Sequence, residues 1–450
     1  MLMVFLSFVI GLKAQPEPMH LKKETREQFK VCWTLENCIK YAQENSIEIQ
    51  QSQLKVEDSE LALNTSQLSR LPNLNANLGG GAYFGRSPSQ SGVYGDNNSM
   101  SGNFGVSTSI PIYEGGRISH QVASRKLNLE ASQKDKEAMS ENIILNIAGL
   151  YLNVLFKGEL VEVGESQLEL SKEQVKRSKA LFESGKSPES DLYESESLVA
   201  RDESTLTQYV NDLRLSVLDL IQAMNLEYSD DFQIYKPTFD SIELFELMNP
   251  EDVYNTALES RPLIEAEAIR LKSKQSDILM AKSSYYPSLS LTAGYGTNLF
   301  HNFKNGFMNK PAWEQLGNNS SGNLGLSLNI PIYNRNVTRN SVKSAELALQ
   351  NQQLYLQNTQ RQLRKDIERA YASAQAAYGK YLSSQKALKA AELAFEYEVT
   401  KSESGRSTIF DFNDTKTRLE KAKSDLVQSK FEYIFKTKML QFYVNGAVSL

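Results

Sequence analysis

The chain has 450 residues and a formal net charge of −5, so it is long enough for two or three ordinary domains and lacks the basic surplus typical of a nucleic-acid-binding protein. Its mean hydropathy of −0.43 argues against a bundle of membrane-spanning helices. The one strongly apolar run, Met1 to Leu12, is too short to span a bilayer as a helix, and we expect no later stretch to do so.

The N-terminal region resembles that of an exported protein. We interpret residues 1–14 as a signal peptide and residues 15–32 as a flexible polar lead. The two cysteines, Cys32 and Cys38, are too few for a disulfide framework, and the sequence leaves open whether they pair.

The first structural repeat covers residues 33–226. Helical periodicity predicts a short helix over residues 33–45 and a second over residues 46–71, which Pro72 ends. Apolar and small polar residues then alternate, which predicts a β-hairpin over residues 74–110 with one apolar face and one face of Ser, Asn and Gly.

Two long helices follow the hairpin. No proline interrupts residues 116–184, and a stretch of that length spans about 100 Å as a helix. Its apolar stripe is as narrow as a coiled-coil seam. The segment Gly185-Lys186-Ser187-Pro188 breaks the helix, and another is predicted over residues 189–226. Residues 227–249 form a linker that we expect to fold into a small side domain, which the family resemblance described below makes an equatorial segment.

The second structural repeat, residues 250–450, follows the same order. It contains two helices that end at Pro287, a β-hairpin over residues 288–330, a long helix over residues 336–404, a break at Gly405-Arg406-Ser407 and a final helix over residues 408–443. The stretch Ile-Pro-Ile-Tyr occurs in both halves, with Pro111 and Pro331 220 residues apart. Because proline cannot donate to a sheet ladder, we expect strand pairing to stop at these two positions.

The alternating strands require partners from other chains. Strands of eight to eleven residues with an apolar and a polar face suit an outer-membrane barrel. A barrel in lipid must close, and four strands are too few to close one. We therefore expect the barrel to be shared among several copies of the chain. The alternative is two hairpins of a soluble β domain, whose core the Ser, Asn and Gly face would make too hydrophilic.

These features together resemble the TolC family of outer-membrane efflux proteins. The resemblance rests on the duplication, the two Ile-Pro-Ile-Tyr junctions, the helix-to-strand junctions at Pro72 and Pro287, and the two glycine turns followed by aspartate. It implies a mainly α fold with a β-barrel part, in which a homotrimer builds a twelve-stranded barrel in the outer membrane of a Gram-negative bacterium and a long periplasmic α-helical barrel.

The resemblance also implies partners and site residues. The partners are a periplasmic adaptor (membrane fusion) protein and an inner-membrane RND or ABC transporter, and the helix turns at Gly185 to Ser187 and Gly405 to Ser407 are the tips that dock the adaptor. Asp411 and Asp414 ring the periplasmic constriction. The family has a tyrosine where Ser402 stands and an arginine where Ser407 stands, so its lock onto Asp191 is incomplete here, and Arg406 is the candidate substitute.

We expect no catalytic, cofactor or metal site. Gly185-Lys186-Ser187 lacks the leading glycine and the preceding strand of a phosphate loop, and the three histidines are scattered without ligand spacing. The predicted function is a passive exit duct for drugs or other cargo in tripartite efflux or type I secretion. A coiled-coil scaffold without a pore is the alternative, and a pump-independent porin is a weaker one. The sequence names neither the cargo nor the pump class.

Overall fold

The structure, a computed structural model, describes residues 32–88, 92, 94–227, 232–237, 249–303, 310–404 and 406–446. The predicted signal peptide, the polar lead up to residue 31, most of the 227–249 linker and Gly405 lie outside the described residues.

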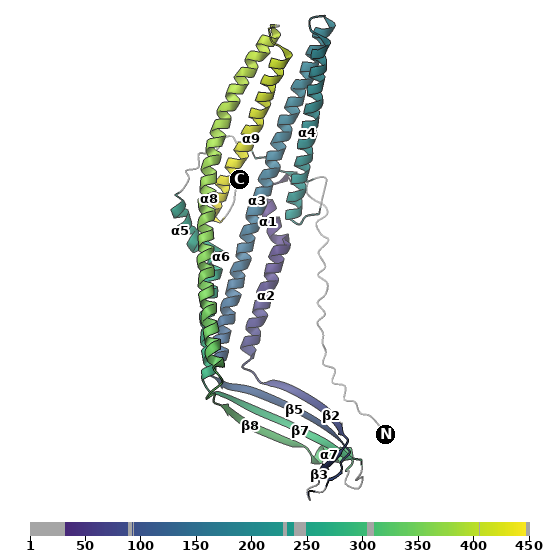
Figure 1. Cartoon of the computed structure of the whole chain (residues 1–450), viewed down its shortest axis with the longest axis vertical. Helices are drawn as coiled ribbons and strands as arrows, with labels where there is room; N and C mark the ends of the chain where they lie inside the picture. The colour runs from purple at the N-terminus through teal and green to yellow at the C-terminus, as the bar shows by residue number, and fades with distance from the viewer. Residues whose placement is uncertain are drawn as a thin grey trace.

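Four antiparallel strands form one sheet in the order β2-β5-β7-β8 (Figure 1). They are β2 (Asn73–Tyr83), β5 (Ser99–Glu114), β7 (Ser288–Asn302) and β8 (Ser321–Asn329). β5 and β7 are longer than the expected eight to eleven residues, with 16 and 15 residues. The predicted loop after β2 also contains a small hairpin of β3 (Arg86–Pro88) and β4 (Tyr94–Asp96).

The prolines delimit the sheet with one exception. Pro72 directly precedes β2, Pro287 directly precedes β7, and Pro331 follows β8. Pairing between β2 and β5 stops before Pro111, at Ser109. The expectation that all pairing stops at Pro111 is wrong, because β5 continues beside β7 as far as Glu114, with a register shift directly after Pro111. An irregularity of this kind lets a strand pass a residue that has no N–H to donate.

The helices agree closely with the sequence pattern. Both long helices, α3 (Arg117–Glu183) and α8 (Val337–Glu403), lie within one residue of the expected ends. The other α-helices are α1 (Leu35–Asn45), α2 (Ile47–Leu68), α4 (Glu189–Ala223), α5 (Pro250–Ser260), α6 (Pro262–Lys282), α7 (Ala312–Asn318) and α9 (Ile409–Asn445), with a short 3-10 turn, η1 (Ser283–Tyr285), after α6. α7 was not expected, because its segment was predicted to be part of a polar loop.

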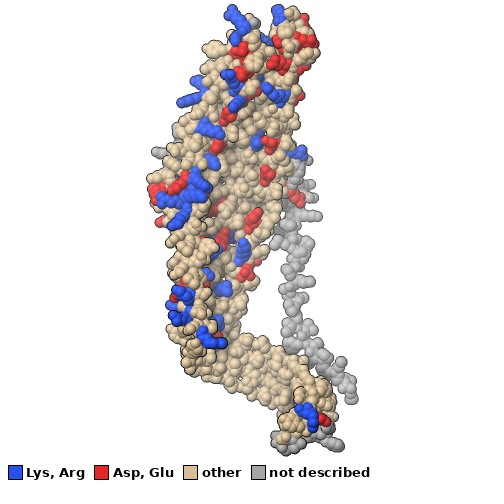
Figure 2. Space-filling view, in the orientation of Figure 1, with Lys and Arg blue, Asp and Glu red and all other residues tan. Residues whose placement is uncertain are grey.

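The helices form a wall that continues the sheet. Next to the sheet, the contacts run α2 to α3, α3 to α6 and α6 to α8, which repeats the order of the attached strands. Farther away, the row becomes α4, α3, α9 and α8 (Figure 1). The two helix turns, after α3 and after α8, lie at the end opposite the sheet. Lys, Arg, Asp and Glu are spread over the helical part, whereas the body of the sheet is free of them on the face shown in Figure 2.

The main apolar core lies at mid-height, where the first-half helices meet α9. Tyr151 of α3 is 1% exposed and donates from its hydroxyl to the carbonyl oxygens of Trp33 and Tyr235, at 3.1 and 2.6 Å. These carbonyls belong to or directly follow a two-stranded parallel sheet of β1 (Cys32–Trp33) and β6 (Gln233–Ile234), which brings the residues just before α1 against the linker between the halves. Cys38 is a free, buried thiol in the same core.

α3 also corrects an expectation about membrane spans. Within the described residues, it is the one helix that is long and apolar enough to cross a membrane, with a window of mean hydropathy 1.4. We had expected none. About 44% of that window is buried inside the chain, and Ile143, Ile147 and Val154 of α3 belong to the mid-height core. Packing against neighbouring helices therefore accounts for part of the apolar stretch.

Candidate functional site

The sheet presents two chemically distinct faces. In the β7–β8 register, Leu291 lies opposite Leu326, and Ser290 lies opposite Ser327. The same agreement continues across β2 and β5, where Leu78 pairs with Phe104. Successive side chains of a strand point to opposite faces, so one face is apolar and the other carries Asn, Ser, Thr and Gly.

Glycines on the polar face make room for asparagine side chains. A Cβ added to Gly79 would lie 2.6 Å from Asn103 Oδ1, and one added to Gly294 would lie 2.7 Å from Asn323 Oδ1. Asparagine side chains from neighbouring strands therefore lie across these glycines. Such a face offers water many donors and acceptors and no charge.

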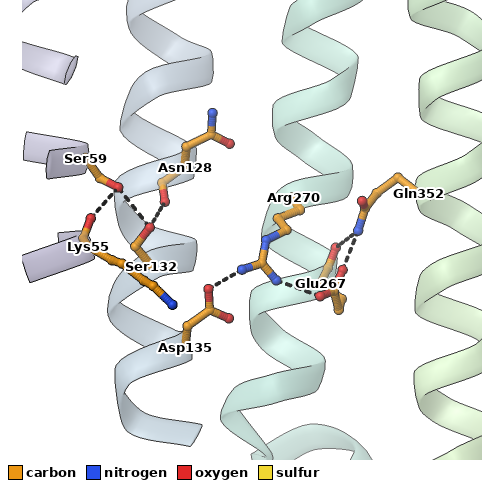
Figure 3. Close-up of polar contacts among 8 residues, drawn as sticks. All are labelled: Lys55, Ser59, Asn128, Ser132, Asp135, Glu267, Arg270 and Gln352. Carbon is orange, nitrogen blue, oxygen red and sulfur yellow. Dashed lines mark hydrogen bonds and ion pairs between the residues drawn. The ribbon is translucent and has the colours of Figure 1, made fainter. Parts of the chain in front are cut away.

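Polar contacts also cross the helical wall where α2, α3, α6 and α8 lie in a row (Figure 3). Ser59 of α2 and Ser132 of α3 are hydrogen-bonded at 2.9 Å. Arg270 of α6 pairs with Asp135 of α3 and, at 2.6 Å, with Glu267 of its own helix. Gln352 of α8 donates to Glu267 at 2.5 Å. One polar layer thus connects all four helices in the row, and burial raises the pKa of Asp135.

The first helix turn has the geometry that its glycine permits. Gly185 has a φ of 70°, a left-handed conformation that L side chains rarely adopt. Its N–H donates to the Phe182 carbonyl and that of Lys186 to the Leu181 carbonyl, at 2.8 and 2.9 Å, which caps the end of α3. Lys186 is exposed. Nothing lies within 4 Å of a Cβ added to Gly185, so the backbone conformation alone selects glycine there.

The predicted acidic residues lie in or near the first turns of α4 and α9. Asp191 accepts a hydrogen bond from Ser187 Oγ at 3.0 Å. The Asp411 N–H donates to Thr408 Oγ1 at 3.1 Å, which caps α9, and its carboxylate lies 3.9 Å from Lys401 Nζ. Asp414 pairs with Arg418 at 2.8 Å. Each acid thus has a local partner, as expected where acids complement a helix dipole.

The second turn does not show the pairing considered for Arg406. Among the described residues, no ion pair joins Arg406 to Asp191 or Asp411, and its backbone N–H donates to the Lys401 carbonyl at 3.0 Å. Ser407 Oγ instead donates to Glu398. Asp411 and Asp414, the residues expected at the constriction, therefore lie together on the second hairpin, whereas Asp191 lies on the first.

Sequence reasoning missed the exposed apolar side chains near both turns. Tyr397 and Phe410 are 76% and 71% exposed on the second hairpin, and Tyr193 is 59% exposed on the first. Their periodicity would have identified them, because they lie off the apolar seams of their helices. Aromatic residues are enriched in protein–protein interfaces.

It also missed a buried charge cluster between the two hairpins. Lys416 of α9 is 1% exposed and lies 3.1 Å from Asp202 Oδ2 of α4. The ammonium also donates to Ser171 of α3 and lies 3.1 Å from Glu420 Oε1, one turn along α9. Gln167 of α3 donates to both carboxylates, at 2.9 and 2.6 Å. The signal in the sequence was Lys416 three residues before Leu419, on the apolar seam of the last helix.

Burial dominates the electrostatics of this cluster. It raises the pKa of Glu420 from 4.5 to about 7; Asp202 raises that pKa further, whereas Lys416 and Arg201 lower it. One ammonium thus faces two carboxylates inside the helical wall, and it ties α9 to both α3 and α4.

The chain thus falls in the class of proteins that join a sheet with one apolar and one polar face to a wall of very long helices. A model of the outer membrane efflux protein family matches residues 38–226 and 253–441. The outer membrane protein TolC of Vibrio cholerae is 25% identical over 345 residues, or 75% of this chain and 75% of that protein. The outer membrane efflux protein BepC of Brucella suis is 19% identical over 333 residues, or 74% of this chain and 70% of that protein.

Solved structures agree with this match. The alignment with the crystal structure of CusC covers 91% of this chain and 91% of that chain, with a TM-score of 0.76 and 17% sequence identity. The chain belongs to the outer membrane efflux protein family. It is an outer-membrane efflux channel protein that extends into the periplasm, and this family consists of transporters rather than enzymes.

Proposed function

We propose that three copies of the chain close a twelve-stranded barrel in the outer membrane and a helical tube in the periplasm. The observation that carries this proposal is that the four-stranded sheet ends in β2 on one side and β8 on the other. Open edges are not tolerated in lipid. Two copies would give about eight strands, whose side chains fill the interior, and the family resemblance favours three.

The two outermost helices of the row next to the sheet, α2 and α8, each carry an exposed apolar stripe. Every seventh residue of α2 is an exposed apolar side chain: Ile47, Leu54, Leu61 and Leu68. This stripe is on the side of α2 away from buried Val56, and α8 exposes Leu347 and Leu354. At about 1.5 Å per residue, Leu61 and Leu347 lie about 10 and 15 Å from the sheet ends of their helices. The two residues therefore lie within about one helical turn of the same height, as an antiparallel contact between neighbouring copies requires.

Cysteine cross-linking tests this assembly. In a background of Cys32→Ser and Cys38→Ala, the pair Leu61→Cys and Leu347→Cys should form disulfides between chains and produce a covalent trimer on a denaturing gel. The control pair replaces Val56, which is 5% exposed, with cysteine instead of Leu61, and should not cross-link. A covalent species that stops at the dimer, or a monomer only, would contradict the trimer.

The internal duplication is part of the same proposal. The strand-to-helix turn of each half contains two consecutive residues in left-handed conformation, Gly115-Gly116 and Arg335-Asn336. The two turns are 220 residues apart, as are the two Ile-Pro-Ile-Tyr stretches. Arginine and asparagine hold a conformation that glycine adopts more easily, which supports one ancestral turn used twice.

The conduit is proposed to narrow at the helix turns, where Asp411 and Asp414 of three copies would ring the opening. A ring of carboxylates attracts cations and selects against anions. Both side chains are about half exposed, 49% and 45%, so they are accessible to ions. The turns at Gly185 and Arg406 and the exposed aromatic residues near them are the surfaces we assign to the adaptor protein, behind which an inner-membrane pump supplies drugs or other cargo.

Single-channel recording in a planar bilayer tests the constriction. We expect wild type to be cation-selective and to be blocked from the periplasmic side by multivalent cations. The variant Asp411→Ala/Asp414→Ala should lose both properties, whereas Asp252→Ala, which removes a first-turn acid of α5, should keep them. Unchanged selectivity in the double variant would remove these residues from the constriction, and absence of any conductance would favour the scaffold alternative.

A further inference from the structure

The short helix α7 lies at the edge of β7 and takes the place of a strand there. β8 pairs with β7 only as far as Gly296, and beyond that point β7 continues to Asn302. Gln315 of α7, which is 8% exposed, accepts from the Phe300 N–H and donates to the Phe300 carbonyl, at 2.8 and 2.9 Å. Asn319, just after α7, donates to the Asn298 carbonyl at 2.6 Å.

These contacts place α7 on the apolar side of the sheet. The Thr297 hydroxyl donates to the Leu316 carbonyl at 3.2 Å. Thr297 lies opposite Phe104 in the register and is two residues from Tyr295, so its side chain belongs to the apolar face. With Gln315 and Asn319 directed at the strand edge, Trp313 and Leu316 are one helical turn apart and are 76% and 46% exposed.

The height of α7 corresponds to a membrane boundary. From Leu289, at the helix end of β7, to Thr297 the strand rises about 27 Å, at roughly 3.4 Å per residue. A tilt of about 35–45° reduces this to about 20 Å, close to the ~25 Å apolar band of outer-membrane barrels. α7 therefore lies where the band ends on the side away from the periplasmic helices. Tryptophan and other aromatic side chains concentrate at such boundaries, because an apolar ring and a polar N–H suit both environments.

We propose that α7 is an interfacial anchor whose Trp313 and Leu316 insert between the headgroups and acyl chains of the outer leaflet. Gln315 and Asn319 fix the helix to the sheet by replacing the missing strand. The occupant of this surface is lipid, since the contact with Thr297 places α7 on the apolar side of the sheet and Trp313 and Leu316 are exposed there. The inference rests on the proposed orientation of the barrel in the membrane.

Tryptophan fluorescence tests the anchor directly, because the chain has only two tryptophans. Trp33 belongs to the periplasmic part, where its ring stacks on Phe232 at 5.8 Å. In Trp33→Phe, all tryptophan emission comes from Trp313. The assembled protein is reconstituted into phosphatidylcholine vesicles whose acyl chains carry bromine at defined depths. We expect Trp313 to lose most of its emission to bromines near the headgroup and less to deeper ones.

Two matched variants make failure interpretable. Trp313→Phe retains only Trp33 and should show no loss of emission. Leu324→Trp in the Trp33→Phe/Trp313→Phe background places the probe on the apolar sheet face opposite Ala293, about halfway between Leu289 and Thr297, and should be quenched most by deep bromines. If that probe is quenched and Trp313 is not, the anchor is refuted and the barrel stands. If neither is quenched, the barrel orientation fails as well. Quenching of Trp313 by acrylamide alone means exposure to water, and quenching by neither agent means cover by a second copy; either result overturns the proposal.

Discussion

Replacing Lys416 with methionine should weaken the connection between the two helical hairpins more than any surface substitution on α9. Methionine preserves the length of the side chain and removes its charge. Asp202, which is 2% exposed, and Glu420, which is 9% exposed, would then face each other without the ammonium that lies 3.1 Å from an oxygen of each.

The size of the effect follows from burial. Each 3.1 Å pair gives about 5 kcal/mol of Coulomb attraction at an effective dielectric constant of ~20, and desolvation of three charges offsets most of it. Removing one member of a buried pair leaves that desolvation cost uncompensated, and such changes typically cost about 3–5 kcal/mol. The change in local opening free energy should fall in that range.

Amide hydrogen exchange measures this opening where it occurs. Exchange in residues 412–424 should accelerate by about two to three and a half orders of magnitude in Lys416→Met, because ~1.4 kcal/mol corresponds to a tenfold change in the population of the open state. The control is Arg418→Met on the same helix, whose partner Asp414 is 2.8 Å away and whose own side chain is 75% exposed. Exposed pairs contribute only about 0–1 kcal/mol, so exchange in this variant should change little.

Equal exchange rates in the two variants would refute the reasoning. They would show that water, or protonation of the carboxylates, already compensates the buried negative charge when Lys416 is removed. The triple variant Asp202→Leu/Lys416→Met/Glu420→Leu is a further check. Replacing a whole buried ionic cluster with apolar side chains is often neutral or stabilising, so this variant should exchange more slowly than Lys416→Met alone.

Three other predictions follow from the cluster, the sheet and the first turn. Because burial raises the folded-state pKa of Glu420 from 4.5 to about 7, folding favours its protonated form; this stabilisation is complete below about pH 4.5, is lost as pH rises toward 7 and is absent above it. The melting temperature of wild type minus that of Glu420→Gln should fall across this window, and a constant difference would show that Glu420 has an ordinary pKa. Leu326→Arg, on the apolar face, should cost up to ~2–4 kcal/mol, the value at mid-bilayer, and lower the yield of heat-modifiable oligomer, whereas Ser327→Arg on the opposite face should assemble normally; equal yields would mean that the assignment of the lipid face is wrong. Gly185→Leu should abolish export and leave the amount of assembled protein in the outer membrane unchanged, because φ at this position is 70° and space is open around it, while Gly158→Ala in α3 should leave export intact; a parallel loss of assembly and export would mean that the turn is needed for folding.

The sequence by itself determined the elements that depend on local periodicity. Alternation with period two predicted both hairpins, and a narrow stripe with helical period predicted α3 and α8 to within one residue at each end. The breaks at Gly185 and the prolines beside β2 and β7 also follow from local backbone chemistry, since glycine accepts a positive φ and proline lacks an N–H. The family resemblance rested on the order and spacing of these same local signals.

Contacts between distant parts of the chain were decided by the tertiary structure. Lys416 and Asp202 are 214 residues apart. The sequence of neither helix predicts that a lysine on one apolar seam contacts an aspartate on another. The sequence pattern did not predict α7 for a related reason. Its seven residues have no strong periodicity, and it is held by Gln315 and Asn319 at a strand edge that exists only because β8 is shorter than β7. A periodic pattern specifies which face of an element is apolar, but the partner of a buried charge or an open strand edge depends on which elements the fold brings together.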